Sequence, residues 1–196
     1  MNLEYLIGLT RKIDWTCLWT FVSAIATVGL FIVAAVQLNK ISKIAQADFI
    51  HRFTESFFRL ECRNLLLLFD YGLLSFKTIK VKDKEIPYFE VDQKMLAEFS
   101  CIDQKTKEHL KSTYSEFDVD DCLLGYLEDI GNYRKERLIN FRLADQVFGS
   151  YIEGLWEDKE VQKYIKWTKK SYGHEIYSGF EGIYNEIQSQ KTPGKL

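Results

Sequence analysis

One stretch of the chain, residues 15–38, reads WTCLWTFVSAIATVGLFIVAAVQL and contains no charged side chain. A helix of these 24 residues would be about 36 Å long. About 20 apolar residues are enough to cross the hydrocarbon core of a bilayer, and a helix buried in a soluble core rarely runs this far without a charge. The stretch therefore predicts a transmembrane helix over residues 15–39, preceded by an N-terminal flank of residues 1–14.

A cleaved signal peptide is the main alternative for this stretch. Such a peptide has an apolar region of only about 7–15 residues, followed by a cleavage site with small side chains. Here the apolar stretch is longer, and it ends in Gln37, Leu38, Asn39 and Lys40, which suit that cleavage poorly. We therefore expect an uncleaved anchor that crosses the lipid bilayer once.

The charges that flank the span predict its orientation. Arg11 and Lys12 precede it, whereas Lys40, Lys43 and Arg52 follow it, and basic residues favour the cytoplasmic side. The four cysteines are spaced too irregularly for a disulfide framework and are expected as free thiols in a reducing compartment: Cys17, Cys62, Cys101 and Cys122. Both features predict a protein of the cell inner membrane with its C-terminal domain in the cytoplasm.

One face of the predicted span carries small and hydroxyl side chains. Thr16, Thr20, Ser23 and Thr27 are separated by offsets that place them on one side of a helix. Such residues let helices approach closely in lipid, so this face is a candidate for homo-oligomerisation. Alternatively, each hydroxyl returns a hydrogen bond to its own backbone.

The remaining residues, 40–190, predict one mostly helical domain, with a frayed tail at 191–196. Only two prolines interrupt the whole chain. Residues 76–91 alternate between apolar and charged side chains, which predicts a small hairpin that turns near Asp83 and Lys84. The chain has 26 basic and 28 acidic residues, with a net charge of −2. This balance argues against a DNA-coating surface, which normally makes a domain strongly basic.

Short polar residues mark the ends of the helices. Asp92 and Asn140 precede apolar stripes and are expected to cap helices at their N-termini. Gly72, Gly131 and Gly173 follow such stripes and are expected to end helices. A polar helix is expected over residues 104–117. The acidic residues after it, Asp118, Asp120 and Asp121, are expected to cap the next helix.

The motifs that many enzymes require are missing. The sequence has no glycine-rich phosphate loop and no nucleophile elbow. Its histidines, His51, His109 and His174, lie far apart, and no histidine or cysteine pair has the spacing of metal ligands. We therefore expect a non-enzymatic protein with no catalytic residues, no metal and no cofactor.

Two groups of basic residues are candidates for binding a phosphorylated ligand. The first surrounds a turn between two predicted helices: Tyr133, Arg134, Lys135, Arg137 and Arg142. Arginine forms a planar fork for phosphate, and Tyr133 offers a ring for stacking on a base, although Glu136 reduces the local charge. The second group is a lysine stripe on one helix: Lys159, Lys163, Lys166, Lys169 and Lys170. A solvated charged surface is the simpler interpretation of that stripe.

Three segments together resemble a family of uncharacterised bacterial single-pass membrane proteins, some of which accompany phage-defence loci. They are residues 15–58, the run LLGYLEDIG at 123–131, and residues 148–156. The resemblance implies one span and a cytosolic helical domain, but no catalytic residues. The architecture is also loosely similar to CRISPR membrane accessory proteins that respond to cyclic oligoadenylate.

These features lead to two hypotheses. In the first, the protein is an antiviral effector that senses a signal such as a cyclic nucleotide, oligomerises and perturbs the membrane through its spans. In the second, it is a membrane-tethered scaffold that recruits a cytosolic protein.

Overall fold

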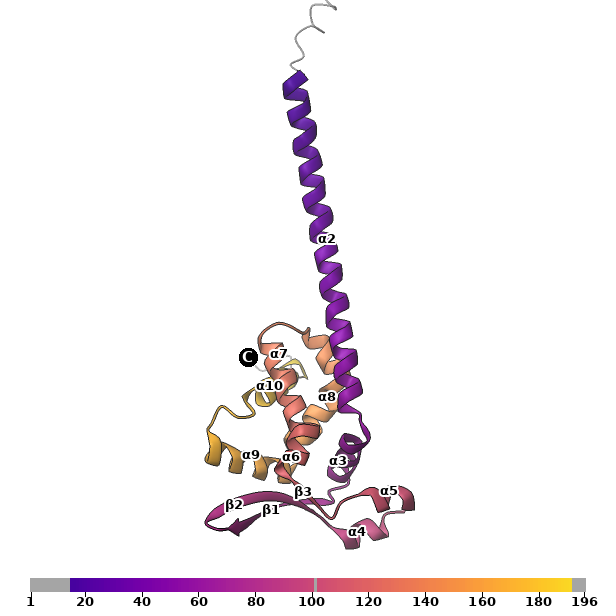
Figure 1. The fold of residues 1–196 in the computed structure, drawn as a ribbon, viewed down its shortest axis with the longest axis vertical. Helices are drawn as coiled ribbons and strands as arrows, with labels where there is room; N and C mark the ends of the chain where they lie inside the picture. The colour runs from indigo at the N-terminus through magenta and orange to yellow at the C-terminus, as the bar shows by residue number, and fades with distance from the viewer. Residues whose placement is uncertain (1–14, 101, 192–196) are drawn as a thin grey trace, which may run out of the picture. The chain divides into compact units, whose positions relative to one another are not determined.

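The computed structural model describes residues 15–100 and 102–191. The predicted flank at 1–14, with Arg11 and Lys12, Cys101 and the tail after Lys191 lie outside this part of the chain. Within it, the protein is 74% helical, with a small three-stranded sheet (Figure 1). The predicted fold class, a long apolar N-terminal helix followed by a helical domain with a hairpin, is confirmed.

The first described element is α2 (Trp15–Phe57), a single helix of 43 residues. It is the one helix of the described chain that is long and apolar enough to cross a membrane. Contacts divide the chain into two compact units, one ending at Ala47 and one beginning at Asp48. The second unit is the helical domain, and the last turns of α2 belong to it.

The C-terminal turns of α2 supply aromatic side chains to the core of the domain. Phe57 is fully buried, and Phe49 and Phe53 pack against the core. The helix then breaks at Phe58 and Arg59 before α3 (Leu60–Asp70) begins. As predicted, Gly72 follows the end of α3, and its positive φ of 62° is a conformation that glycine adopts without strain.

The sheet consists of β1 (Leu74–Val81), β2 (Lys84–Val91) and β3 (Thr113–Ser115), which are antiparallel and lie in that order. The hairpin turns at Lys82 and Asp83, one residue earlier than predicted. Both turn residues have positive φ, 47° and 66°, as in the mirror-image turns that match the twist of paired strands.

Helices α4 (Gln93–Glu98) and α5 (Gln104–His109) connect β2 to β3. The side chain of Asp92 accepts hydrogen bonds from two backbone amides of α4, so its predicted capping role is confirmed. The helix predicted over 104–117 is wrong in its second half, where β3 forms instead. The buried Tyr114 lies opposite the buried Phe89 of β2, and this packing outweighs the polar, helix-compatible composition.

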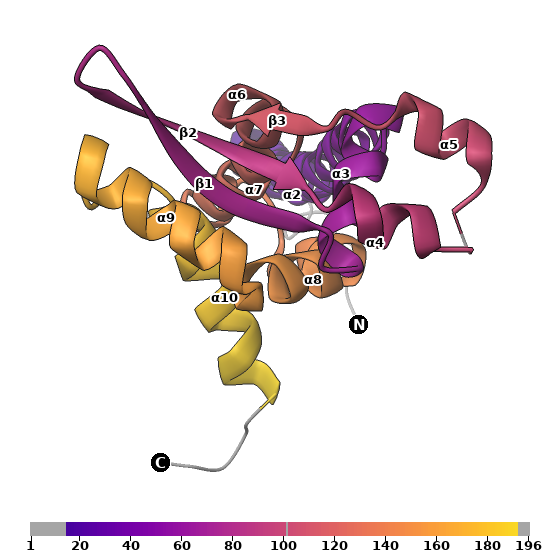
Figure 2. The ribbon, with the colours of Figure 1, turned by 90° about the horizontal axis from the view of Figure 1, so that it is seen from below.

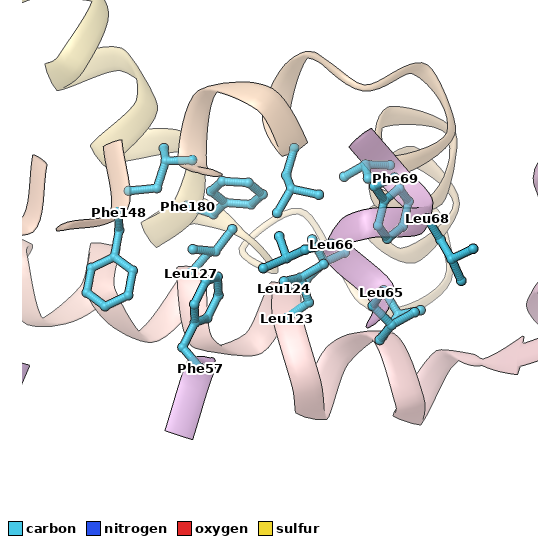
Figure 3. Close-up of a cluster of buried hydrophobic side chains, with 14 of the residues drawn as sticks. Phe57, Leu65, Leu66, Leu68, Phe69, Leu123, Leu124, Leu127, Phe148 and Phe180 are labelled. Atoms are coloured by element: carbon cyan, nitrogen blue, oxygen red, sulfur yellow. The ribbon is translucent and has the colours of Figure 1, made fainter. Parts of the chain in front are cut away.

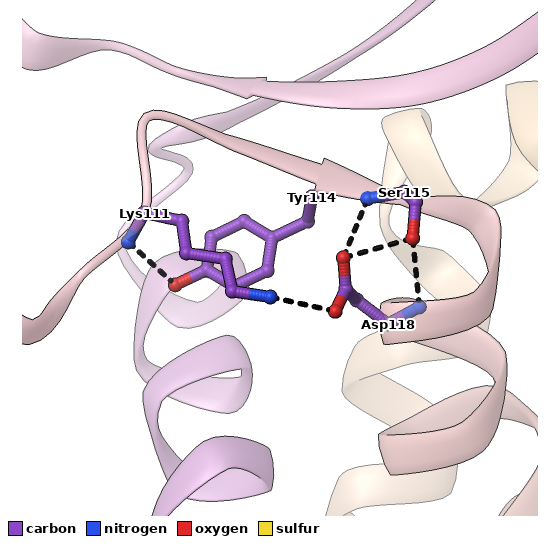
Figure 4. A network of polar contacts seen from close by, with 4 residues as sticks. All are labelled: Lys111, Tyr114, Ser115 and Asp118. Atoms are coloured by element: carbon purple, nitrogen blue, oxygen red, sulfur yellow. Dashed lines mark hydrogen bonds and ion pairs between the residues drawn. The ribbon is translucent and has the colours of Figure 1, made fainter.

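After β3, the chain enters α6 (Glu116–Val119), the π-helical turn η1 (Asp120–Leu124) and α7 (Gly125–Lys135) without leaving the helical conformation. Ser115 and Asp118 form a capping box at the start of α6, and Lys111 pairs with Asp118 at 2.8 Å (Figure 4). Of the acidic residues expected to cap, Asp118 does so, whereas Asp120 and Asp121 lie inside η1.

Three further helices complete the domain: α8 (Phe141–Glu157), α9 (Lys159–Tyr172) and α10 (Ser178–Lys191). Asn140 caps α8 and Gly173 follows α9, both as predicted. A continuous hydrophobic core joins these helices to α2, α3 and α7 (Figure 3). Its fully buried members include Phe57, Leu65, Leu123, Leu127, Phe148 and Phe180.

Candidate functional site

Helices α7 and α10 cross at two buried glycines. A Cβ atom on Gly131 would lie 1.9 Å from the carbonyl oxygen of Gly179, and one on Gly179 would lie 2.6 Å from the carbonyl oxygen of Glu128. The prediction that Gly131 ends a helix is therefore wrong: it lies within α7, where it allows the two backbones to touch.

Glu128 fixes the start of α10 at this crossing. Its carboxylate accepts hydrogen bonds from the backbone amides of Gly179 (3.1 Å) and Phe180 (2.8 Å). It also accepts one from the side-chain amide of Asn132 at 3.2 Å. A carboxylate satisfies the free amides of a helix N-terminus and matches its positive dipole, so Glu128 holds α10 against α7.

Beside the crossing lies a surface groove of about 400 Å³, here called the α7–α10 groove. Its lining combines glycine backbone, three basic side chains and one carboxylate: Gly131, Arg134, Lys135, Arg137, Ser178, Gly179, Gly182, Ile183 and Glu186. Two of the four residues predicted to bind a ligand, Arg134 and Arg137, are therefore brought to one groove.

The charge of Arg134 is compensated within the groove. Its guanidinium group binds Glu186 in a bidentate manner, with Nη2–Oε1 at 2.7 Å and Nε–Oε2 at 3.0 Å. The hydrogen bond from Arg134 to Glu186 raises the pKa of the guanidinium. Arg134 also lies over the ring of Phe141, 5.9 Å from its centre. Arg134 therefore mainly links α7 to α10.

Lys135 and Arg137 are the exposed cations of the groove. Within the described part of the chain, neither forms an ion pair with a carboxylate, and Glu136 does not line the groove. The two side chains therefore give the groove an uncompensated positive charge. Such a site favours an anionic ligand, and arginine suits a phosphate group because it donates two parallel hydrogen bonds.

Arg137 occupies a backbone position that normally favours glycine. Its φ is 59°. Its amide donates to the carbonyl of Arg134 at 3.0 Å, and the amide of Leu138 donates to the carbonyl of Tyr133 at 2.9 Å. These two bonds form a Schellman motif, whose left-handed residue is usually glycine. A side chain there costs about 1 kcal/mol, and residues held in this way are concentrated at functional sites.

The other two predicted ligand-binding residues are not among the groove's lining residues. Tyr133 packs edge-on against Phe49, with ring centres 5.0 Å apart, so it helps to hold the end of α2 to the domain. Arg142 is exposed in the first turn of α8. The sequence did not indicate α10 as a wall of the groove, because its lining residues lie far from Arg137 along the chain.

The predicted oligomerisation face lies on the exposed part of α2. The hydroxyl of Thr20 donates to the carbonyl of Thr16 at 2.7 Å, and that of Thr27 donates to the carbonyl of Ser23 at 2.8 Å. Backbone hydrogen bonding, the alternative interpretation, therefore holds for these two hydroxyls. Homo-oligomerisation through this face stays a prediction.

A second polar cluster, not foreseen from the sequence, lies inside the domain. Asp120, in η1, accepts hydrogen bonds from the hydroxyls of the buried Tyr164 (2.7 Å) and Tyr177. Burial raises the pKa of Asp120, while the two hydroxyls act in the opposite direction. The cluster joins η1 to α9 and to the segment before α10, and this structural role accounts for it.

The cysteines and acidic residues form no further reactive centre in the part of the chain that the structure describes. Cys17, Cys62 and Cys122 are free thiols there. Burial raises the pKa of Cys62 to about 12, which makes its thiol unreactive. No group of three histidine, cysteine or acidic side chains capable of holding a metal ion occurs among the described residues.

Comparison of the chain with family models, with curated proteins and with solved structures finds no match.

Proposed function

We propose that this protein is a membrane-anchored, non-enzymatic effector whose domain binds a phosphorylated signal in the α7–α10 groove. This proposal rests on the conformation of Arg137. Its backbone is held in the strained left-handed region, and its guanidinium group, which has no carboxylate partner in the described part of the chain, lies at the groove. Lys135 adds a second cation, and the exposed backbone at Gly182, with no atom within 4 Å of a Cβ position, leaves room for a ligand.

The similarity of the architecture to CRISPR membrane accessory proteins suggests a cyclic nucleotide as the signal. Its phosphates would meet Arg137 and Lys135, and the groove's volume of about 400 Å³ is within the range of small-molecule sites. The role in antiviral defence comes from the resemblance of the sequence to single-pass proteins near phage-defence loci. The apolar segment of α2 supports attachment to the inner membrane, and its basic flank supports a cytoplasmic domain.

The effector mechanism couples ligand binding to assembly of the spans. A ligand shifts assembly only if it binds one assembly state better than the other. In the proposed cycle, binding in the groove favours an oligomer in which the α2 segments lie together and perturb the bilayer.

Ligand binding is tested by a thermal-shift titration of the full chain in detergent against cyclic dinucleotides and cyclic oligoadenylates. A ligand of the native state raises the Tm in a concentration-dependent way. The double variant Lys135→Glu with Arg137→Glu is expected to lose this shift, because both unpaired cations are reversed. Arg134 is a poorer choice, since its loss would leave Glu186 unpaired.

A matched control reverses two exposed lysines away from the groove, Lys94→Glu with Lys105→Glu. It makes the same change in net charge and should retain the full shift. An equal loss in both double variants would reduce the effect to overall charge and would contradict a specific site.

A further inference from the structure

The outer edge of β1 has unpaired backbone groups. In the β1–β2 ladder, the amide of Phe76 points away from β2, because it donates to Oε2 of Glu160 at 2.9 Å. Alternate residues of a strand direct their amide and carbonyl groups to the same side, so Thr78 and Lys80 also point away from β2. Within the described chain, their amides have no backbone partner. The edge is therefore open beyond Phe76.

Helix α9 packs against the inner face of the hairpin and runs beside β1 (Figure 2). The ring of Tyr164 contacts those of Phe76 in β1 and Phe89 in β2. Glu160 contacts the start of the strand, and the indole nitrogen of Trp167 lies 3.4 Å from Glu85, near the hairpin turn. Lys163 and Lys170 share the face of α9 that carries these two residues, since they lie three and ten positions after Glu160. Lys163 pairs with Glu160 at 2.6 Å, so Lys170 is the cation of this face that has no ion pair within the described part of the chain.

The face of the hairpin that points away from the domain is apolar near the turn. Ile79 lies directly opposite Ile86, and these side chains are 52% and 44% exposed. Val81, two residues further along β1 and on the same face, is 43% exposed. This face therefore offers three branched aliphatic side chains that an added strand could cover.

We propose that the open edge of β1 binds an extended acidic segment of a partner protein as a fourth strand. The backbone of the partner would pair with Thr78 and Lys80, as in β-strand addition. Side chains of a strand alternate between its two faces. The partner's apolar residues would therefore lie beside Ile79 and Val81, and its acidic residues would face Lys80 of β1 and Lys170 of α9.

The lysines favour such a partner over a second copy of this chain. Lys80 lies on β1 and Lys82 follows in the turn, whereas Lys77 is paired with Glu90 of β2. A second β1 strand paired here in parallel and in register would place Lys80 beside Lys80, and like charges opposite one another destabilise strand pairing. Edge lysines commonly prevent this kind of self-association. The site is independent of the α7–α10 groove and of any ligand bound there.

The test measures binding of a labelled peptide of alternating valine and glutamate to the full chain in detergent. Thr78→Pro removes the outward amide but leaves the β1–β2 ladder intact, and proline is tolerated on edge strands. Thr78→Val, the matched control, keeps that amide. Thr78→Pro is expected to bind the peptide about tenfold more weakly than Thr78→Val, corresponding to about one hydrogen bond.

A second pair of measurements tests the charge preference and does not depend on the proline variant folding. The wild-type chain should prefer the glutamate peptide to one of alternating valine and lysine. Lys80→Glu with Lys170→Glu should reverse that preference. Equal binding of both peptides, equal binding by Thr78→Pro and Thr78→Val when both fold, or cross-linking of β1 to a second copy would each overturn the proposal.

Discussion

Arg137 links the stability of the domain to its proposed ligand site. Its left-handed backbone closes α7, and its side chain is an unpaired cation on the groove. A residue selected for stability alone at this position would be glycine. The arginine at this position therefore supports the proposed ligand site by an observation separate from the charge pattern in the sequence.

Arg137→Gly is expected to stabilise the protein and to abolish ligand binding. Relief of the left-handed strain contributes up to about 1 kcal/mol, or a rise in Tm of about 2–4 °C for a chain of this size. Thermal unfolding in detergent, with and without ligand, measures both effects. Asp83→Gly is the matched control, because Asp83 also has a positive φ but lies in the hairpin turn. It should be stabilised and still bind ligand.

The buried carboxyl group of Asp120 is expected to make the stability of the domain depend on pH. Burial raises its pKa above the ordinary value of 3.8, so the folded protein holds the proton more tightly than the unfolded chain does. Its contribution to stability is therefore fully present below about pH 3.8 and falls as the pH rises through the folded-state pKa. The side chain of the Asp120→Asn variant cannot ionise, so its free energy of unfolding lacks this decrease with rising pH.

The measurement is chemical denaturation of both proteins at several pH values between about 4 and 7. The free energy of unfolding of the wild type, minus that of Asp120→Asn, should decrease with rising pH. A difference that increases with pH would mean that the two tyrosines, Tyr164 and Tyr177, lower the pKa of Asp120 more than burial raises it.

At the scale of helices and strands, the crossing of α7 and α10 determines the position and width of the groove. Glu128 caps α10, and the glycine contact sets the distance between the two helices. Neither helix alone forms the site, since the basic residues come from α7 and its C-terminal turn, while Glu186 comes from α10.

Gly131→Ala is expected to lower the free energy of unfolding by about 3 kcal/mol, because its methyl group would overlap the backbone of Gly179. Denaturant titration measures this loss. Gly154→Ala, within α8 and with open space at its Cβ position, should instead stabilise the protein by up to about 1 kcal/mol. Similar small effects at both positions would contradict the close crossing.

The helices and strands that were predicted correctly are those whose ends are determined by residues close together in sequence. Asp92, Asn140 and Gly173 each mark a helix end through contacts with their immediate neighbours, and all three do so in the structure. The hairpin follows from its alternation. By contrast, β3 depends on the packing of Tyr114 against β2, and Gly131 is interior because α10 returns to touch it. These features require partners distant in sequence.

The candidate site also depends on contacts between residues that are distant in sequence, so the sequence predicted only part of it. Arg134 and Arg137 were identified from the sequence because they are close together and basic. Glu186, which compensates Arg134, lies 52 residues further along the chain. The left-handed conformation of Arg137 carries no sequence signal, since glycine would be the expected residue there.

At the scale of the whole molecule, one chain contains a helix long and apolar enough to span a bilayer and a domain with a groove lined by basic residues. In the proposed function, the charge-free segment of α2 attaches the protein to the membrane, and Arg137 binds the ligand. Signal-dependent perturbation of the membrane requires both parts in one chain.

The most direct test is dye release from liposomes that contain the full chain, after addition of cyclic dinucleotides or cyclic oligoadenylates. The account predicts ligand-dependent release by the wild type and none by Arg137→Gly, although that variant is at least as stable. Release should also stop when residues 15–38 are replaced by an unrelated apolar span. Equal ligand-dependent release by the wild type and Arg137→Gly, or no release with any of these ligands, would contradict the account.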